Sequence, residues 1–335
     1  MSIERDTWPL RLIGSDAVRR LLPVGDCIDA METAFRALAD GRAVQPLRTV
    51  IRIPRSRDSL YVMPAHVGDD GEPALAVKLV SLFPGNTAHG IDTHQGAVIL
   101  FDNVTGRVRA IIEAGSLTAI RTAAVSALAT RYLARPDAAE LAILGSGVQA
   151  RTHVEAMLAV RPVRRVRIWS RTPERARVFA REMTERHDVL IDVMGTAADA
   201  VHGADIICTV TAAREPVLSG AWLSRGAHVN AVGASTRDTR ELDTEAIAKA
   251  ALWVDSREAA GSESGDYLIA RAEAGDAVSI RGELSDLVKG SVAARNRDAE
   301  ITIFKSLGLA IEDAAAARLV CERAVAAGLP PTDFH

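Results

Sequence analysis

The sequence of 335 residues has few cysteines, few aromatic residues and no long apolar run. Its three cysteines, Cys27, Cys208 and Cys321, lie far apart without the spacing of a metal site, which favours a reducing compartment. No segment approaches the ~18 apolar residues that a membrane helix needs. The first residues, MSIERDTWPLRLIG, also lack the apolar core of a signal peptide. We therefore expect a cytoplasmic protein that does not interact with a membrane.

An excess of charge of one sign is also missing. The formal net charge is −3, which gives no general attraction to nucleic acid or acidic lipid. The arginine-rich residues 161–182 suggest a polyanion partner at first sight. Solvated helix faces and one cofactor phosphate explain the same stretch, and we prefer that interpretation. With 48% hydrophobic and 25% charged residues, the composition is typical of a soluble globular protein.

The first third of the chain predicts a β-rich domain. Residues 15–40 have helical periodicity that ends at Gly41. Strand-like segments follow between residues 47 and 113, and the stretch FDNVTGRV, with Asn103 and Gly106, is typical of a hairpin turn. We expect a mixed, mostly antiparallel sheet with a leading helix.

From residue 116 the pattern changes to alternating strands and helices. An Ala-rich helix over 116–134 is expected to end at Arg135-Pro136. The strands ELAILG, RVRIWS, VLIDVM, ADIICTV, AHVNAVG and ALWVDS then recur at intervals that fit crossover helices. This predicts an α/β fold with a Rossmann-type doubly wound parallel sheet. The last 37 residues predict a strand, a glycine turn and a long helix that packs back on the first domain.

A glycine-rich turn predicts a dinucleotide site. Gly145-Ser146-Gly147-Val148-Gln149-Ala150 lies directly between a predicted strand and a predicted helix. Gly145 permits the tight turn, Gly147 lets the backbone approach a pyrophosphate, and Ala150 allows close strand–helix packing. A glycine turn without a cofactor is the alternative.

The end of the next strand indicates which nicotinamide cofactor is bound. NAD sites usually place Asp or Glu there to bind the ribose hydroxyls. Here the strand ends Trp169-Ser170-Arg171-Thr172, with Arg175 one helical turn later. Guanidinium groups bind a 2′-phosphate and no carboxylate repels it, so NADP(H) is favoured, with NAD(H) possible.

Four cationic or titratable residues are candidates for a substrate site. Lys78 and Arg48 interrupt apolar strand-like segments, Arg121 lies near the start of the Ala-rich helix, and His94 precedes a strand. Each has an ordinary structural explanation alone; together they predict a cation-rich pocket for a small carboxylate. His89 and His94, five residues apart without a third ligand, do not predict a metal site.

Several ordered motifs together resemble the ornithine cyclodeaminase/mu-crystallin family. They are KLVSLFPGN, THQGAVILFD, SLTAIRTAAVSALAT, ILGSGVQARTHVEAM, VRIWSRTPERA, VNAVGAS…REL, VDSREAAGSESGD and FKSLGLAIEDAAAA. The resemblance covers nearly the whole chain. It implies a homodimer with an NAD(P)-binding Rossmann domain at residues 121–306. It also implies a second α+β domain for substrate binding and dimerisation, built from residues 1–120 and 307–335.

The resemblance also implies roles for individual residues. For the substrate, the carboxylate is held by Arg48, Lys78 and Arg121, Lys78 is also a proton donor or acceptor, and Glu263 reaches toward the substrate. For the cofactor, the pyrophosphate is bound by Gly147, Val148 and Gln149, the adenosine phosphate is met by Ser170, Arg171, Thr172 and Arg175, and the cofactor is also contacted by Ser306. The nicotinamide side is lined by Val232 and Ser235, and the residues near the nicotinamide or the substrate are Thr93 and His94.

Ser235 separates two chemistries within the family. Cyclodeaminases carry an acid at this position, whereas chains that share GAS..D.REL and ESGD look like its ketimine reductase branch. That branch reduces Δ1-pyrroline-2-carboxylate to L-proline and Δ1-piperideine-2-carboxylate to L-pipecolate. A protonated imine is already an electrophile, so hydride delivery needs positioning and a proton source rather than a strong base. We therefore expect an NADPH-dependent imine reductase.

Three alternatives stay open. Asp238 could fold back and supply the missing carboxylate. The chain could be an NAD-dependent ornithine cyclodeaminase or alanine-type dehydrogenase. It could also be a non-catalytic protein that binds a nicotinamide or another small ligand.

Overall fold

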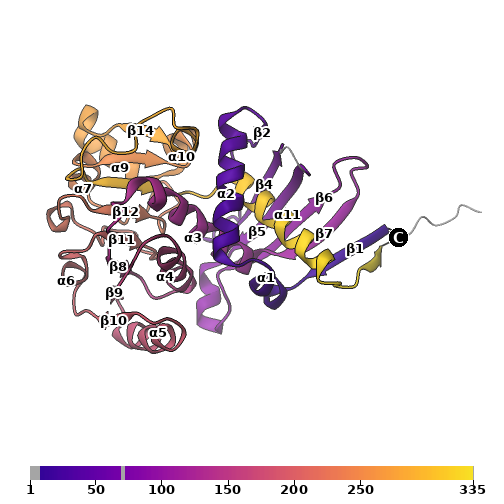
Figure 1. Ribbon diagram of the computed structural model, residues 1–335, viewed down its shortest axis with the longest axis horizontal. Helices are drawn as coiled ribbons and strands as arrows, with labels where there is room; N and C mark the ends of the chain where they lie inside the picture. Colours follow the sequence, from indigo (N-terminus) through magenta and orange to yellow (C-terminus); the bar gives the residue numbers. More distant parts are fainter. Residues whose placement is uncertain (1–7, 69–71, 335) are drawn as a thin grey trace, which may run out of the picture. The chain divides into compact units, whose positions relative to one another are not determined.

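The computed structural model describes residues 8–68 and 72–334. The chain divides into two compact units: unit 1 is Met1–Arg121 with Leu309–His335, and unit 2 is Thr122–Gly308 (Figure 1). The first seven residues of the segment judged to lack a signal-peptide core lie outside the described residues. No described helix is both long enough and apolar enough to cross a membrane.

Unit 1 is built on a mixed sheet. Among its described residues, eight strands run in the order β16-β1-β7-β6-β5-β4-β2, with β3 paired to β4. Only β1 and β7 are parallel; the other described pairs are antiparallel, which confirms the prediction of a mostly antiparallel sheet. The strands are β1 (Trp8–Ile13), β2 (Ala43–Val44), β3 (Thr49–Arg52), β4 (Ser59–Val67), β5 (Ala74–Leu82), β6 (His94–Phe101), β7 (Val108–Glu113) and β16 (Thr332–Phe334).

The predicted leading helix is two helices. The helix α1 (Ser15–Leu21) ends before Pro23, and α2 (Val24–Ala39) begins directly after it. A proline disfavours helical geometry in the residue before it and cannot donate a backbone hydrogen bond, so it ends the first helix and begins the second. The expectation of one continuous helix over 15–40 was therefore wrong at this point.

Two helices cover one face of the unit 1 sheet. The helix α11 (Ala310–Ala326) packs against β4, β5, β6 and α2, and both α2 and α11 lie over these strands in Figure 1. Buried residues alternate along β5 as Ala74, Ala76, Lys78 and Val80, so these side chains point to the helix-covered face. The predicted return of the C-terminal helix to the first domain is confirmed.

Unit 2 is a parallel doubly wound sheet. Its eight described strands run in the order β10-β9-β8-β11-β12-β15-β13-β14, and all neighbours are parallel, as predicted. The strand order reverses between β8 and β11, which marks the ligand-binding edge of such sheets. The strands are β8 (Glu140–Leu144), β9 (Arg165–Trp169), β10 (Leu190–Val193), β11 (Ile206–Thr209), β12 (His228–Ala231), β13 (Ala251–Val254), β14 (Ile280–Glu283) and β15 (Thr302–Lys305).

Helices flank this sheet in the expected order. The predicted Ala-rich helix is α3, which passes from unit 1 into unit 2, and the predicted start of α5 at Pro173 with Thr172 as N-cap is confirmed. The helices are α3 (Ala114–Leu133), α4 (Val148–Val160), α5 (Pro173–Arg186), α6 (Ala197–Val201), α7 (Thr244–Ala248), α8 (Arg257–Glu263), α9 (Gly265–Ala274) and α10 (Leu284–Lys289), with short 3-10 turns at η1 (Pro84–His89), η2 (Gly220–Trp222) and η3 (Gly275–Ala277).

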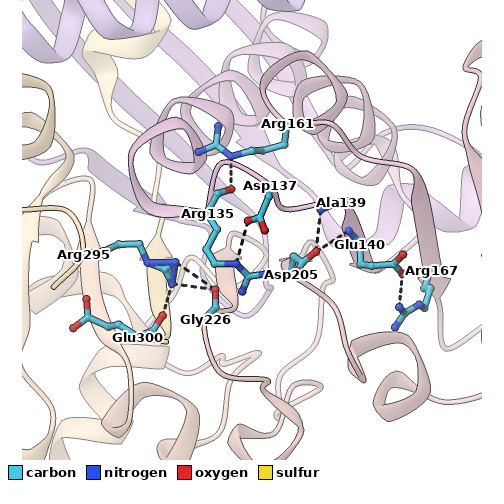
Figure 2. A network of polar contacts seen from close by, with 10 residues as sticks. All are labelled: Arg135, Asp137, Ala139, Glu140, Arg161, Arg167, Asp205, Gly226, Arg295 and Glu300. Atoms are coloured by element: carbon cyan, nitrogen blue, oxygen red, sulfur yellow. Dashed lines mark hydrogen bonds and ion pairs between the residues drawn. The ribbon is translucent and has the colours of Figure 1, made fainter. Parts of the chain in front are cut away.

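Arginines close the amino edge of the parallel sheet. Arg161 donates to the carbonyl oxygens of Thr130 at 2.7 Å and Ala134 at 2.9 Å, which satisfies the last carbonyls of α3. Arg135 pairs with Asp205 at 2.5 Å, and Asp205 accepts from the backbone at the start of β8. Figure 2 shows this network continuing through Glu140 to Arg167, and beside it a second group in which Arg295 donates to the carbonyl oxygens of Gly226 and Glu300. The polar groups at this edge are thus engaged with one another.

Candidate active site

The glycine turn after β8 contains two glycines that differ in their surroundings. Gly145 has φ +119°, and a Cβ there would lie 2.7 Å from the carbonyl oxygen of Val210. The fold itself therefore requires glycine at this position. A Cβ at Gly147 would meet nothing within 4 Å. The fold does not require glycine there, whereas a ligand approaching the backbone would.

The start of α4 has the properties of a phosphate site. Gly147 is the N-cap, no side chain caps the helix, and its first turn holds no acid, so its amide groups face no competing carboxylate. Ala150 is fully buried, as close strand–helix packing requires. Val148 is half exposed.

Two buried polar atoms indicate where a ligand would complete the structure. Gln149 Oε1, in the first turn of α4, and Ser306 Oγ, directly after β15, have no hydrogen-bond partner among the described residues. Buried polar atoms are rarely left without a partner, because the loss of hydration costs free energy. Together with Gly147, these residues fit a bound dinucleotide.

The residues after β9 fit an adenosine phosphate. Ser170 accepts a hydrogen bond from Ser146 Oγ at 2.9 Å, which ties this segment to the glycine turn. Arg171, Thr172 and Arg175 are exposed. Among the described residues, neither guanidinium has a hydrogen bond or an ion pair. Both remain able to bind an anion, and no acid ends the strand.

A buried carboxylate, Glu241, organises the loops after β11 and β12. It accepts hydrogen bonds from the backbone N–H of Thr211 and of Gly233, both at 2.7 Å, and from Thr209 Oγ1 at 2.8 Å. Burial raises its pKa above the ordinary value for a glutamate. A Cβ at Gly233 would lie 2.1 Å from the Thr211 carbonyl oxygen, so the two loops approach closely.

A buried ion pair holds the next turn of the same loop. Lys305 Nζ donates to the carbonyl oxygen of Ala234 at 2.5 Å and pairs with Asp266 at 2.9 Å. Asp266 also accepts from the amide of Glu241 at 2.8 Å. Sequence reasoning missed Glu241, Asp266 and Lys305 as individual residues. The available signal was a charged residue in each of the motifs REL, ESGD and FKS.

The predicted nicotinamide-side residues follow these fixed strands. Val232 and Ser235 come after β12, and both are partly exposed. Glu263 is the last residue of α8 and is partly buried. Asp238, the alternative acid, is two-thirds exposed and pairs with Arg214 at 2.6 Å. The surface pairing of Asp238 argues against its acting in place of an acid at position 235.

Lys78 is a buried cation in an apolar layer. Its register neighbours on the same face, Met63, Val98 and Ile112, are all buried, and Lys78 itself is 3% exposed. Its Nζ donates to Asp313 Oδ1 at 3.1 Å. Burial first, and then repulsion from Arg121, lower the pKa of Lys78 to about 8, against the opposing effect of Asp313.

Arg121 on α3 shares the acid that binds Lys78. Its Nε donates to Asp313 Oδ1 at 2.9 Å and its Nη1 donates to Glu312 Oε2 at 2.5 Å. Burial alone would lower the pKa of Arg121, but Asp313 and Glu312 raise it above its usual value. The expected cation-rich pocket is thus a buried cluster of two cations and two carboxylates. Unpaired charges in this apolar layer would cost several kcal/mol each, which is why α11 supplies acids.

The remaining predicted residues of unit 1 lie around this cluster. His94 begins β6, and its Nδ1 lies 3.1 Å from Thr93 Oγ1. Desolvation first, then repulsion from Lys78 and Arg121, lower the pKa of His94 to about 4, so its ring is neutral near pH 7. Among the described residues, no group of three or more His, Cys, Asp or Glu side chains is arranged to hold a metal ion.

The sequence predicts Arg48 inside a strand-like segment. In the structure it directly precedes β3 instead. Its guanidinium carbon lies 5.8 Å from the centroid of the Tyr61 ring. Thr49 pairs with Val62, so the register places Arg48 beside Met63, which in turn pairs with Lys78. Arg48 therefore belongs to the same cross-strand row as Lys78, two strands away.

Comparisons with known proteins point to one family. Residues 13–328 match the profile of the ornithine cyclodeaminase/mu-crystallin family. The chain is 44% identical over 293 residues to the ketimine reductase mu-crystallin of Rattus norvegicus, covering 88% of this chain and 89% of that protein. It is 37% identical over 320 residues to a Delta(1)-pyrroline-2-carboxylate reductase of Bacillus cereus, covering 95% of this chain and 98% of that protein.

Solved structures share the fold over nearly the whole chain. The Delta(1)-pyrroline-2-carboxylate reductase of Thermococcus litoralis, in complex with NADH and L-proline, has a TM-score of 0.92 and 39% identity, covering 97% of this chain and 100% of that chain. An archaeal alanine dehydrogenase dimer with bound NAD has a TM-score of 0.90 and 29% identity, covering 98% and 99%.

Proposed function

Because the chain belongs to the ornithine cyclodeaminase/mu-crystallin family, we propose that it is an NADPH-dependent reductase of small cyclic ketimine carboxylates. Its substrates are Δ1-pyrroline-2-carboxylate, which gives L-proline, and Δ1-piperideine-2-carboxylate, which gives L-pipecolate. The observation that carries the proposal is the buried pair Lys78 and Arg121, which joins a carboxylate anchor to a proton source. Reductases of this substrate class are among its relatives, and a solved neighbour holds L-proline.

Unit 1 binds and protonates the substrate. Arg121, Arg48 and Lys78 attract its carboxylate, and several cations on one carboxylate fix the ring plane. With a pKa of about 8, Lys78 is mostly protonated at neutral pH and can give its proton to the ring nitrogen. His94 is neutral there and adds no charge.

Unit 2 binds the cofactor through the start of α4, Gln149 and Ser306. When bound, the nicotinamide supplies a hydride to the imine carbon. Ser235 offers a hydroxyl and no carboxylate, which suits reduction rather than expulsion of ammonia. The preference for NADPH rests on the exposed guanidinium groups of Arg171 and Arg175 after β9.

We also propose that two chains associate through the second face of the unit 1 sheet. Large apolar side chains there are exposed: Leu12 by 59%, Ile51 by 54%, Leu60 by 37% and Leu75 by 36%. The register places them on the face opposite to Lys78, and an exposed apolar patch of this kind typically marks a protein interface. For location we propose the cytoplasm, because the three cysteines are buried free thiols.

Steady-state assays test the activity. The purified protein is mixed with each cyclic imine and with NADPH or NADH, and consumption of the reduced nicotinamide is followed by absorbance. We expect faster turnover with NADPH, and L-proline or L-pipecolate as the chromatographically identified product. A separate assay offers the protein ornithine with NAD⁺, which tests the cyclodeaminase reaction. Release of ammonia and proline from ornithine would refute the proposal, and cofactor binding without any turnover would favour a binding protein.

A further inference from the structure

Asp313 joins the two buried cations, and the proposed mechanism gives it no role. Its Oδ1 accepts from Lys78 Nζ at 3.1 Å and from Arg121 Nε at 2.9 Å. The residue is 1% exposed. Three elements that are distant in the sequence, β5, α3 and α11, therefore meet at one carboxylate oxygen.

We infer that Asp313 is a positioning residue for imine reduction: its Oδ1 holds the ammonium of Lys78 and the guanidinium of Arg121 at the spacing at which both bind one substrate carboxylate. Long side chains have many rotamers, and two like charges repel each other when they are desolvated. One shared acceptor restricts the rotamers of both side chains and offsets the repulsion between their charges. The inference rests on the proposed function and assigns a role to a residue outside its binding groups.

The two oxygens of Asp313 differ in their surroundings. Oδ2 is buried and has no hydrogen-bond partner among the described residues. Because an unsatisfied buried acceptor costs free energy, an arrangement with a partner for each oxygen would stabilise the fold more. The carboxylate instead gives both cations the same oxygen, which fixes their separation.

Other groups also face the cluster. Glu312 of α11 accepts a hydrogen bond from Arg121, Lys78 and Arg121 disfavour the charged form of His94 of β6, and the Cys27 thiol of α2 lies near Arg121 and Glu312. Asp313 is the acid that hydrogen-bonds Lys78. Removing its charge leaves Lys78 facing Arg121 with weaker compensation, so Lys78 should lose its proton at lower pH.

Asp313→Asn tests the role, and Glu312→Gln is the matched control because it neutralises the neighbouring acid on the same helix. The chain has four lysines, Lys78, Lys249, Lys289 and Lys305, so NMR of protein labelled with ¹³C at lysine Cε resolves each titration. Lys78→Arg assigns the signal. We expect the midpoint of Lys78 to fall by about one unit or more in Asp313→Asn, and by less in Glu312→Gln.

Kinetics separate position from charge. Asp313→Asn should raise KM for the cyclic imine about tenfold or more, since the carboxylate anchor loses its alignment, while the Kd for NADPH stays within about twofold. Asp313→Glu keeps the charge but moves the oxygen by one methylene group. We expect its Lys78 midpoint to stay near that of the wild type and its KM to remain raised. Normal KM in Asp313→Glu would overturn the positioning role, as would an unchanged Lys78 midpoint in Asp313→Asn.

The two proposals fail in different ways. Wild-type protein that reduces neither cyclic imine refutes the proposed function, whereas the lysine titration needs no substrate and still judges the contact with Asp313. If Asp313→Asn does not fold, shown by loss of both NADPH binding and cooperative melting, Asp313→Glu decides the inference through KM.

Discussion

The pH dependence of imine reduction tests the assigned proton donor directly. Lys78 has a pKa of about 8, and in the proposed mechanism its protonated form gives the proton to the substrate. Roughly nine tenths of Lys78 is protonated at pH 7 and roughly one tenth at pH 9. We therefore expect kcat/KM to be nearly constant from pH 5.5 to 7, and to fall about tenfold per unit well above pH 8. His94, with a pKa of about 4, adds no change within this range.

The assay follows NADPH consumption with Δ1-pyrroline-2-carboxylate from about pH 5 to 10 at constant ionic strength. The ring nitrogen of the substrate also titrates, so the wild-type profile alone does not assign the fall. Lys78→Arg supplies the control because guanidinium stays protonated throughout the range. We expect the plateau of this variant to drop by about 100-fold, as the loss of a general acid predicts, and the fall near pH 8 to disappear.

The result that would refute the reasoning is specific. If Lys78→Arg keeps the wild-type fall near pH 8, the titrating group belongs to the substrate or to another residue. Lys78 would then be only a binding group. A plateau within about twofold of the wild-type value would remove Lys78 from proton transfer altogether.

Three further predictions follow from the same structure. Arg171→Asp should raise the Kd for NADPH about 10- to 100-fold and leave NADH within about twofold by fluorescence titration, because it repels only the extra phosphate; equal losses would contradict this. Gly147→Val should abolish dinucleotide binding while the melting temperature stays within a few degrees. Gly145→Ala should instead destabilise the fold by about 2 kcal/mol, because residue 145 has a positive φ and a Cβ there would meet Val210. Val77→Arg, on the open face of β5, should yield monomers in analytical ultracentrifugation if that face joins two chains.

The sheet of unit 2 could be predicted from sequence because its signals are local. Each parallel strand is an apolar run followed by a helical period, and the turn Gly145–Ala150 lies between one such pair. The start of α5 was equally local, since Thr172 and Pro173 are adjacent. β14 was missed, because its four residues, Ile280–Glu283, include a charged residue at positions 281 and 283 and a glycine.

The edges of the unit 1 sheet could not be predicted in the same way. β1 lies beside β7 and β16, and the register joins Leu10 to Thr332. Short strands have weak patterns, and the pairing of β1 depends on β7, about 100 residues away, and on β16, more than 300 residues away. The break between α1 and α2 at Pro23 could have been predicted from the sequence, since a proline ends a helix. The helical periodicity was instead extended through it.

Glu312 and Asp313 of α11 were not among the site residues predicted from the sequence. Lys78 occupies the same alternating set as Ala74, Ala76 and Val80, so strand parity already placed it on the buried face. A buried cation requires a buried anion, because the cost of removing water is offset only by pairing. Residues 310–317 are apolar apart from Glu312 and Asp313, and an apolar helix that carries acids is the complementary signal. Parity and charge balance together therefore point to this helix as the partner of Lys78, although neither pattern alone identifies the contact.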